Sequence, residues 1–155
     1  MAIRSLSISM TSSTSSRARL ERVYRRTAYH VIDGEQSFAL TIGVREGRLD
    51  ALLARHRARF GVLISAYNPD SQPLDDRTNR RREAAFERSL ATPYLPAWGE
   101  GLVGNWKPEV GVLLLGVTPH RARRLGARWE QVAVVVGIRG GRPRLLWCRT
   151  ANFTR

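Results

Sequence analysis

The side chains best suited to hold a ligand follow the apolar segment 62–64. The segment 62–71 begins as a buried strand would and ends in a polar turn. Its polar residues are Ser65, Tyr67, Asn68, Asp70 and Ser71. In open α/β sheets, ligands bind in the crevice beyond the strand ends. The segment therefore predicts a site for a small polar ligand or an anion, at the point where the strand ends.

Helix periodicity adds Asn79 to the same predicted site. Asp75-Asp76 predict the start of a helix, because acidic side chains favour the positive end of the helix dipole. Asn79, Phe86 and Leu90 are spaced i, i+7 and i+11 and so share one helix face. Asn79 then faces inward, one turn into the helix and close to the polar turn. Two roles are compatible with this position: it pins the turn, or it contacts a ligand.

The chain carries no familiar catalytic motif. Its three histidines, His30, His56 and His120, are far apart and lack the spacing of a metal-binding helix. Ser65 lacks the flanking glycines of a nucleophile elbow. Residues 99–104 match G-x-G-x-x-G, but no strand precedes them and no helix opens on them in the predicted pattern. We therefore reject a dinucleotide site and expect a flexible loop there.

Four acidic residues near the polar turn leave a hydrolase or nuclease as an alternative, because such enzymes use carboxylates to hold a divalent metal. These are Asp70, Asp75, Asp76 and Glu109. Asp75 and Asp76 are already explained by helix capping. Glu109 approaches Asn68 only if strands 62–67 and 110–117 are antiparallel, and the sequence leaves this direction open. We predict no metal site and no cofactor.

Hydrophobic periodicity predicts the elements that position these residues. The expected strands span 27–32, 38–42, 62–67, 110–117, 132–138 and 144–148, and the expected helices span 46–60, 75–91 and 118–129. The order β-β-α-β-α-β-α-β-β predicts an α+β or mixed α/β single domain around one mixed sheet. His56 falls on the apolar stripe of its helix, so we expect it to be packed.

Length and composition support one globular domain. The chain has 155 residues, of which 43% are hydrophobic. We expect a disordered Ser/Thr-rich tail at 1–18 and the domain at 19–155, with Met1 and Met10 as alternative starts. No apolar run is long enough for a transmembrane helix, and the single Cys148 excludes an intramolecular disulfide. We expect a cytoplasmic protein with no membrane partner, and the oligomeric state is left open.

The net charge of +13 makes a nucleic-acid binder the second hypothesis, because arginine neutralises phosphate. The other interpretation is compositional bias, since the arginines are spread along the whole chain. The candidate phosphate contacts are Arg80, Arg81, Arg121, Arg124, Arg139 and Arg142.

The chain contains four short motifs in this order: Tyr24-Arg-Arg-Thr-Ala-Tyr29, Ile64-Ser-Ala-Tyr-Asn-Pro69 with Ser71 and Asn79, Trp106 with Pro108-Glu109, and Gln131-Val-Ala133. In this, the chain resembles the bacterial proteins grouped as domain of unknown function 3293, over about residues 20–138. It departs from the family at Val110-Gly111, where a small hydroxyl residue or Pro-Ser is common.

The family brings no established activity, so the resemblance implies the position of a pocket and no reaction. The candidate pocket residues are Ser65, Tyr67, Asn68, Ser71, Asn79, Trp106, Glu109 and Gln131. Tyr67 and Trp106 would form its walls.

Overall fold

A computed structural model describes residues 12–104 and 107–149 of the chain; for residues 12–15 it describes the backbone only. Its elements are α1 (Ser12–Arg25), β1 (Thr27–Asp33), β2 (Gln36–Leu40), α2 (Gly47–Arg55), β3 (Phe60–Ile64), the 3₁₀ turn η1 (Pro69–Ser71), α3 (Asp76–Ser89), β4 (Tyr94–Gly101), β5 (Glu109–Leu115), α4 (Pro119–Arg128), β6 (Ala133–Ile138) and β7 (Arg144–Trp147). Each predicted strand and helix has a counterpart. The predicted order is incomplete, because α1 and β4 are additional.

The strands form one sheet in the order β2-β1-β4-β5-β3-β6-β7, and every described pairing is antiparallel. The fold is therefore α+β, and the prediction of a mixed sheet is wrong. The physical reason lies in the crossovers. Helices α3 and α4 each join two strands that run in the same direction, but β5 lies between β3 and β4, and β3 lies between β5 and β6.

The predicted flexible loop at 99–104 is also partly wrong, because β4 takes up its first three residues. Strand β4 pairs with β1 from Ala97 to Gly101 and with β5 from Tyr94 to Gly99. Pro96 lies just outside the part paired with β1, where β4 has a neighbour on one side only. A proline is tolerated at such a position because fewer backbone N–H groups are needed for the ladder.

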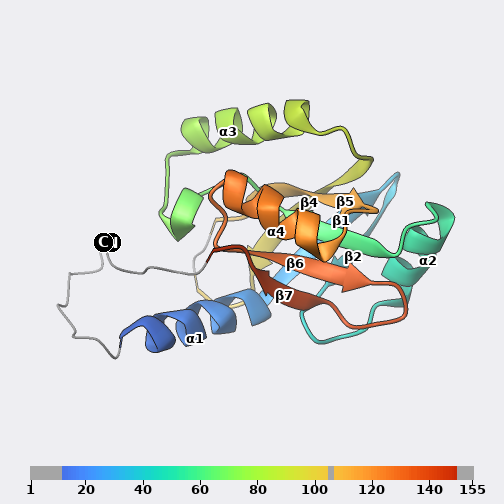
Figure 1. Ribbon diagram of the computed structural model, residues 1–155, viewed down its shortest axis with the longest axis horizontal. Helices are drawn as coiled ribbons and strands as arrows, with labels where there is room; N and C mark the ends of the chain where they lie inside the picture. The colour runs from blue at the N-terminus through green and yellow to red at the C-terminus, as the bar shows by residue number, and fades with distance from the viewer. Residues whose placement is uncertain (1–11, 105–106, 150–155) are drawn as a thin grey trace.

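The sheet separates two apolar cores. Helices α3 and α4 pack on one face, around Phe86, Ala122 and the even-numbered residues of the central strands. Helices α1 and α2 lie on the other face, which is filled at one end by Leu49, Leu52 and Leu53. Figure 1 shows α1 and the α3–α4 pair on opposite sides of the strands. We call the α1–α2 side the concave face, because the N–H of Gly43 after β2 reaches the carbonyl of Pro143 before β7 at 2.8 Å and so links the two edges.

Two local predictions need correction. Residues 12–18, expected within the disordered tail, form the first half of α1, while residues 1–11 lie outside the described part. Helix α2 ends at Arg55, earlier than expected, because Arg57 adopts a left-handed backbone conformation with φ 51°. The chain therefore turns at His56, which is exposed and not packed. No helix of the described residues is long and apolar enough to cross a membrane.

Candidate functional site

A cavity of about 510 Å³ lies on the half of the concave face that α2 leaves uncovered. Strand side chains alternate between the two faces, so the odd-numbered residues of β4, β5 and β6 point into this space. Five of them are small: Ala97, Gly99, Gly101, Gly111 and Ala133. The sheet curves and α1 lies across it, so the small side chains leave a hollow between them.

The predicted polar turn forms one end of this cavity. Ser65 holds the point where the chain passes from β3 into the turn. The hydroxyl of Ser65 donates to the carbonyl of Val110 at 2.6 Å and accepts from the N–H of Tyr67 at 3.0 Å. These two bonds continue the contact between β3 and β5 where the ladder has ended at Ile64 and Val112. Ser65, Tyr67, Asn68 and Ser71 all line the cavity.

Glu109 comes to this turn because β3 and β5 are antiparallel. Its carboxylate Oε1 accepts from Nδ2 of Asn68 at 2.7 Å. Glu109 is partly buried and lines the cavity. Burial raises the pKa of Glu109 above its usual range, and the Asn68 amide partly offsets this rise. The relative direction of β3 and β5, which the sequence left open, is antiparallel, and this brings Glu109 to the predicted pocket.

Asn79 lies behind the turn and does not line the cavity. It is 4% exposed. Its Oδ1 accepts from the N–H of Asn68 at 2.9 Å, and its Nδ2 donates to Oδ1 of Asn68 at 2.8 Å and to the carbonyl of Leu74 at 3.2 Å. Asn68 is left-handed, with φ 47°. These bonds favour the first of the two predicted roles, in which Asn79 pins the turn.

Gln131 ties the turn to the start of β6 and also lines the cavity. Its Nε2 donates to the carbonyls of Tyr67 at 3.1 Å and Trp129 at 3.3 Å. Trp106, the predicted second wall, falls outside the described residues. The structure therefore brings six of the eight predicted pocket residues to one cavity: Ser65, Tyr67, Asn68, Ser71, Glu109 and Gln131.

Two tyrosines that were not proposed as site residues complete the lining. Tyr24 comes from α1 and Tyr29 from β1, and the hydroxyl of Tyr29 donates to the carbonyl of Tyr24 at 3.3 Å. Burial raises the pKa of both phenols far above the usual value, and the nearby Glu109 carboxylate adds to the effect. Both residues therefore stay neutral at physiological pH. They belong to the Tyr24–Tyr29 motif of the family resemblance, which is the signal that points to them.

The sequence-based reasoning also missed Glu83, a carboxylate buried between α3 and the polar turn. Glu83 is 4% exposed, and its Oε2 accepts from the N–H of Ala66 at 2.7 Å. Its Oε1 is buried without a partner among the described residues. Burial raises the pKa of Glu83 to about 7. Asn79, Glu83 and Phe86 share the inward helix face, so the helix periodicity that placed Asn79 could also have placed Glu83.

Arg82 holds the turn from the same helix. Its guanidinium donates to the carbonyl of Ala66 at 2.9 Å and to that of Trp129 at 3.1 Å, and it pairs with Glu130 at 3.2 Å. The N–H of Asp70 donates to the carbonyl of Glu130 at 2.7 Å. The turn is thus held on three sides, by α3, by β5 and by the connection between α4 and β6.

The acidic residues considered for a metal do not gather at this site. Asp70 pairs with Arg149, and Asp75 caps α3 by accepting from the N–H of Thr78 at 2.8 Å. Asp76 pairs with Lys107 at 3.4 Å. In the described ranges, no three His, Cys, Asp or Glu side chains come close enough to hold a metal ion.

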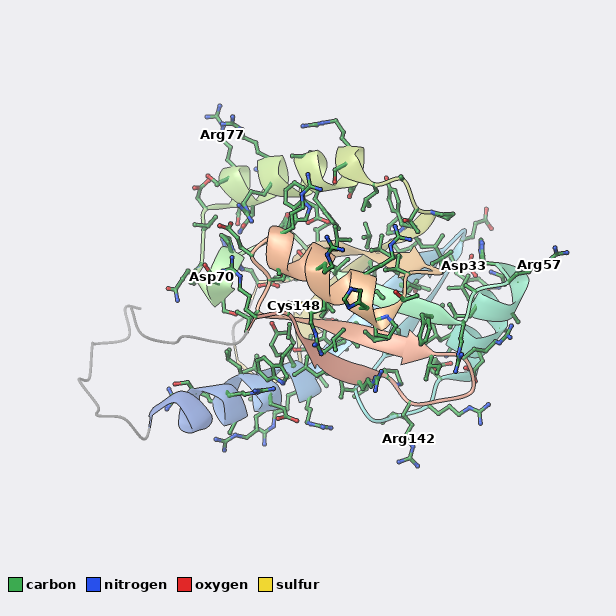
Figure 2. All side chains as sticks on the ribbon, in the orientation of Figure 1. Asp33, Arg57, Asp70, Arg77, Arg142 and Cys148 are labelled. Atoms are coloured by element: carbon green, nitrogen blue, oxygen red, sulfur yellow. The ribbon has the colours of Figure 1, made fainter. Side chains whose placement is uncertain are left out.

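The candidate phosphate-binding arginines are exposed and fall into two groups. Arg80 and Arg81 lie on α3 and Arg121 and Arg124 on α4, which pack on the same face of the sheet. Arg139 and Arg142 flank the connection between β6 and β7. In Figure 2, Arg142 and Arg77 of α3 project from opposite sides of the molecule. These six arginines therefore do not form one patch.

Comparison with known protein families gives a match over part of the chain. A family model described as "Protein of unknown function (DUF3293)" matches residues 64–134, which include the polar turn, α3, Glu109 and Gln131. The chain matches no curated protein and no solved structure at a significant level. The predicted resemblance is confirmed over residues 64–134, where this chain is similar to the DUF3293 family of proteins of unknown function.

Proposed function

We propose that this protein binds a small organic molecule in the cavity of the concave face. The observation that carries the proposal is the convergence of chemistry and space. Residues from three distant parts of the sequence, the turn 65–71, Glu109 and Gln131, meet at one end of a cavity of about 510 Å³. A volume in this range suits a drug-sized ligand, and a few polar groups in a mainly apolar pocket are typical of ligand sites.

The lining favours a ligand with an apolar or flat body and a polar head. The body would contact Leu63, Ala97 and Ala133 and the rings of Tyr24 and Tyr29. The head would lie at the polar turn. The bonds that hold this turn also support the proposal, because a preorganised site loses less conformational entropy when it binds. The single cysteine, Cys148, is buried and reduced, which supports a cytoplasmic location as part of the same proposal.

The test is a fragment screen by ligand-observed NMR on the full chain and on two variants. Ala133→Phe fills the cavity with an aromatic side chain, and Ala51→Phe adds the same side chain at an exposed position of α2. We expect fragments that bind the wild type and Ala51→Phe but not Ala133→Phe. Circular dichroism checks that both variants fold, and Ala133→Leu is a smaller replacement if Ala133→Phe does not. A screen without binders, or binders that ignore Ala133→Phe, would rule the proposal out.

Nucleic-acid binding stays a second candidate because of one feature of α4. Its ten residues contain four arginines and no acid, and all four are exposed. These are Arg121, Arg123, Arg124 and Arg128. None of them forms an ion pair with a described residue. The neighbouring helix α3 adds Arg80 and Arg81 on the same side of the sheet. The hydrolase or nuclease alternative has no such feature to support it.

Fluorescence anisotropy with a labelled duplex at two salt concentrations tests this candidate. If α4 contacts phosphates, replacing its four exposed arginines by serine lowers the affinity strongly and flattens the salt dependence. The matched control is Arg139→Ser with Arg142→Ser, which removes charge from the far hairpin. Equal effects per arginine removed would show attraction by net charge alone.

A further inference from the structure

The hydrogen bonds at the polar end of the cavity determine which groups are left for a ligand. One Nδ2 hydrogen of Asn68 goes to Glu109, and the other has no partner among the described residues; its Oδ1 accepts from the N–H of Leu74 at 3.0 Å and from Asn79. The hydroxyl of Ser65 donates its only hydrogen to Val110. Of these two side chains, only Asn68 keeps a hydrogen that a ligand could use.

Besides the hydroxyls of Tyr67 and Ser71, two side-chain acceptors at this end lack a described partner. Glu109 uses Oε1 for Asn68, and its Oε2 has no partner among the described residues. Two backbone carbonyls, those of Tyr67 and Trp129, lie next to one end of the Gln131 amide. Carbonyls only accept hydrogen bonds, so the atom that faces them is the donor Nε2. Its Oε1 has no partner in the described part of the chain. A ligand head at this end therefore meets a carboxylate oxygen and an amide oxygen, both of which accept hydrogen bonds.

No described cation forms an ion pair with Glu109, although Arg22, Arg26 and Lys107 also line the cavity. Although the sequence has 26 basic and 13 acidic residues, no described arginine, lysine or histidine lies within ion-pair distance of its carboxylate. Other acids, including Asp33, Asp50 and Glu130, do pair with arginine. A partly buried carboxylate without a cation is costly to ionise, which agrees with the raised pKa of Glu109, and a cationic ligand would offset this cost.

We propose that the cavity selects organic cations, namely ligands whose amine, amidinium or guanidinium head binds Glu109 Oε2 and Gln131 Oε1. This inference rests on the proposed function and names its ligand class. The N–H groups of such a head donate to both acceptors, and charge assistance strengthens the bond to Glu109. The rings of Tyr24 and Tyr29 line the same cavity, and aromatic rings attract cations through their faces. An anionic head, which the sequence left open, would meet the Glu109 carboxylate and be repelled.

Three probes of nearly equal shape and different charge test this inference: benzamidine as the cation, benzamide as the neutral compound and benzoate as the anion. Each is titrated by ligand-observed NMR into the wild-type chain, Glu109→Gln and Ala133→Phe. We expect benzamidine to bind the wild type more tightly than benzamide and benzoate not to bind. Glu109→Gln, which keeps the shape and removes the charge, should weaken benzamidine at least about tenfold and change benzamide by less than about threefold. Ala133→Phe should remove both.

The outcomes separate the two proposals. If benzamide or benzoate binds as well as benzamidine, or if Glu109→Gln leaves benzamidine unchanged, the cation proposal is wrong. The proposed function then still stands, provided that Ala133→Phe abolishes the binding. If no probe binds the wild type, the cation proposal is wrong as well, and the fragment screen decides on the cavity itself.

Discussion

Asn79 is the residue whose replacement should most clearly separate the architecture of the site from its chemistry. Its side chain makes three hydrogen bonds, two to Asn68 and one to Leu74, and it is 4% exposed. At about 1 kcal/mol for each net bond, Asn79→Ala should lower the free energy of unfolding by about 3 kcal/mol. The N–H of Asn68 loses its partner, so the turn should also loosen.

Urea unfolding followed by circular dichroism measures this loss, and Arg80→Ala, an exposed neighbour on the same helix, is the control with an expected change within about 0.5 kcal/mol. Because Asn68 and Asn79 bond to one another, the double variant Asn68→Ala/Asn79→Ala should cost less than the sum of the two single changes. A loss below about 1 kcal/mol for Asn79→Ala, or strict additivity in the double variant, would refute the role of this pair in holding the turn.

Three further predictions concern titration and packing. Burial raises the pKa of Glu83 from 4.5 to about 7 in the folded chain. Between these pH values the native state binds more protons than the unfolded state, so stability falls as pH rises. The pKa difference corresponds to about 3 kcal/mol of stability. Urea unfolding at pH 5 and pH 8 should show this loss of stability in the wild type but not in Glu83→Gln, and equal pH dependence of both proteins would contradict the prediction. Gly111→Ala should destabilise the chain by about 2 kcal/mol, because the new Cβ would lie 2.5 Å from the carbonyl oxygen of Ile64; Gly47→Ala, with open space around it, is the control in the same unfolding assay. Benzamidine should bind more tightly as pH rises, because the pKa of Glu109 lies above its usual range and only the ionised carboxylate attracts a cation; dissociation constants that are equal at pH 5 and pH 8 would contradict this.

The sequence was sufficient to predict the elements whose signals are local. Asp75 caps its helix as predicted, and Thr118 caps the helix predicted at 118–129; each side chain accepts from the backbone three residues later. The inward position of Asn79 followed from helix periodicity alone. The polar turn at the end of β3 was found because an apolar run stops abruptly at Ser65.

The sheet topology could not be predicted, because strand neighbours are chosen by long-range packing. The helices α3 and α4 do join strands of equal direction, but no local signal shows that a third strand inserts between each pair. Strand β4 contains Pro96 and two glycines, residues that are usually found in loops, so no strand was predicted there. The tolerance for them comes from the tertiary structure, where Gly99 faces the ring of Tyr29 across the pairing of β1 and β4.

The candidate site was predicted in part for the same reason. Antiparallel pairing of β3 and β5 brings Glu109 to Asn68, and the sequence left this pairing open. The cavity depends on small residues from several strands and on α1, so no single stretch of the sequence reveals it. Glu83 was overlooked because a buried carboxylate on an inward helix face looks like a surface residue when its neighbours are arginines.

A titration of ¹⁵N-labelled protein with benzamidine, followed by amide NMR shifts, tests the central claim most directly. If the cavity is the ligand site, the shifts that change should cluster at Tyr29, Ser65, Asn68, Glu109 and Ala133, and the amides of α4 should stay unchanged. Changes confined to α3 and α4, or no saturable change at any amide, would contradict the claim that this protein binds an organic cation on the concave face of its sheet.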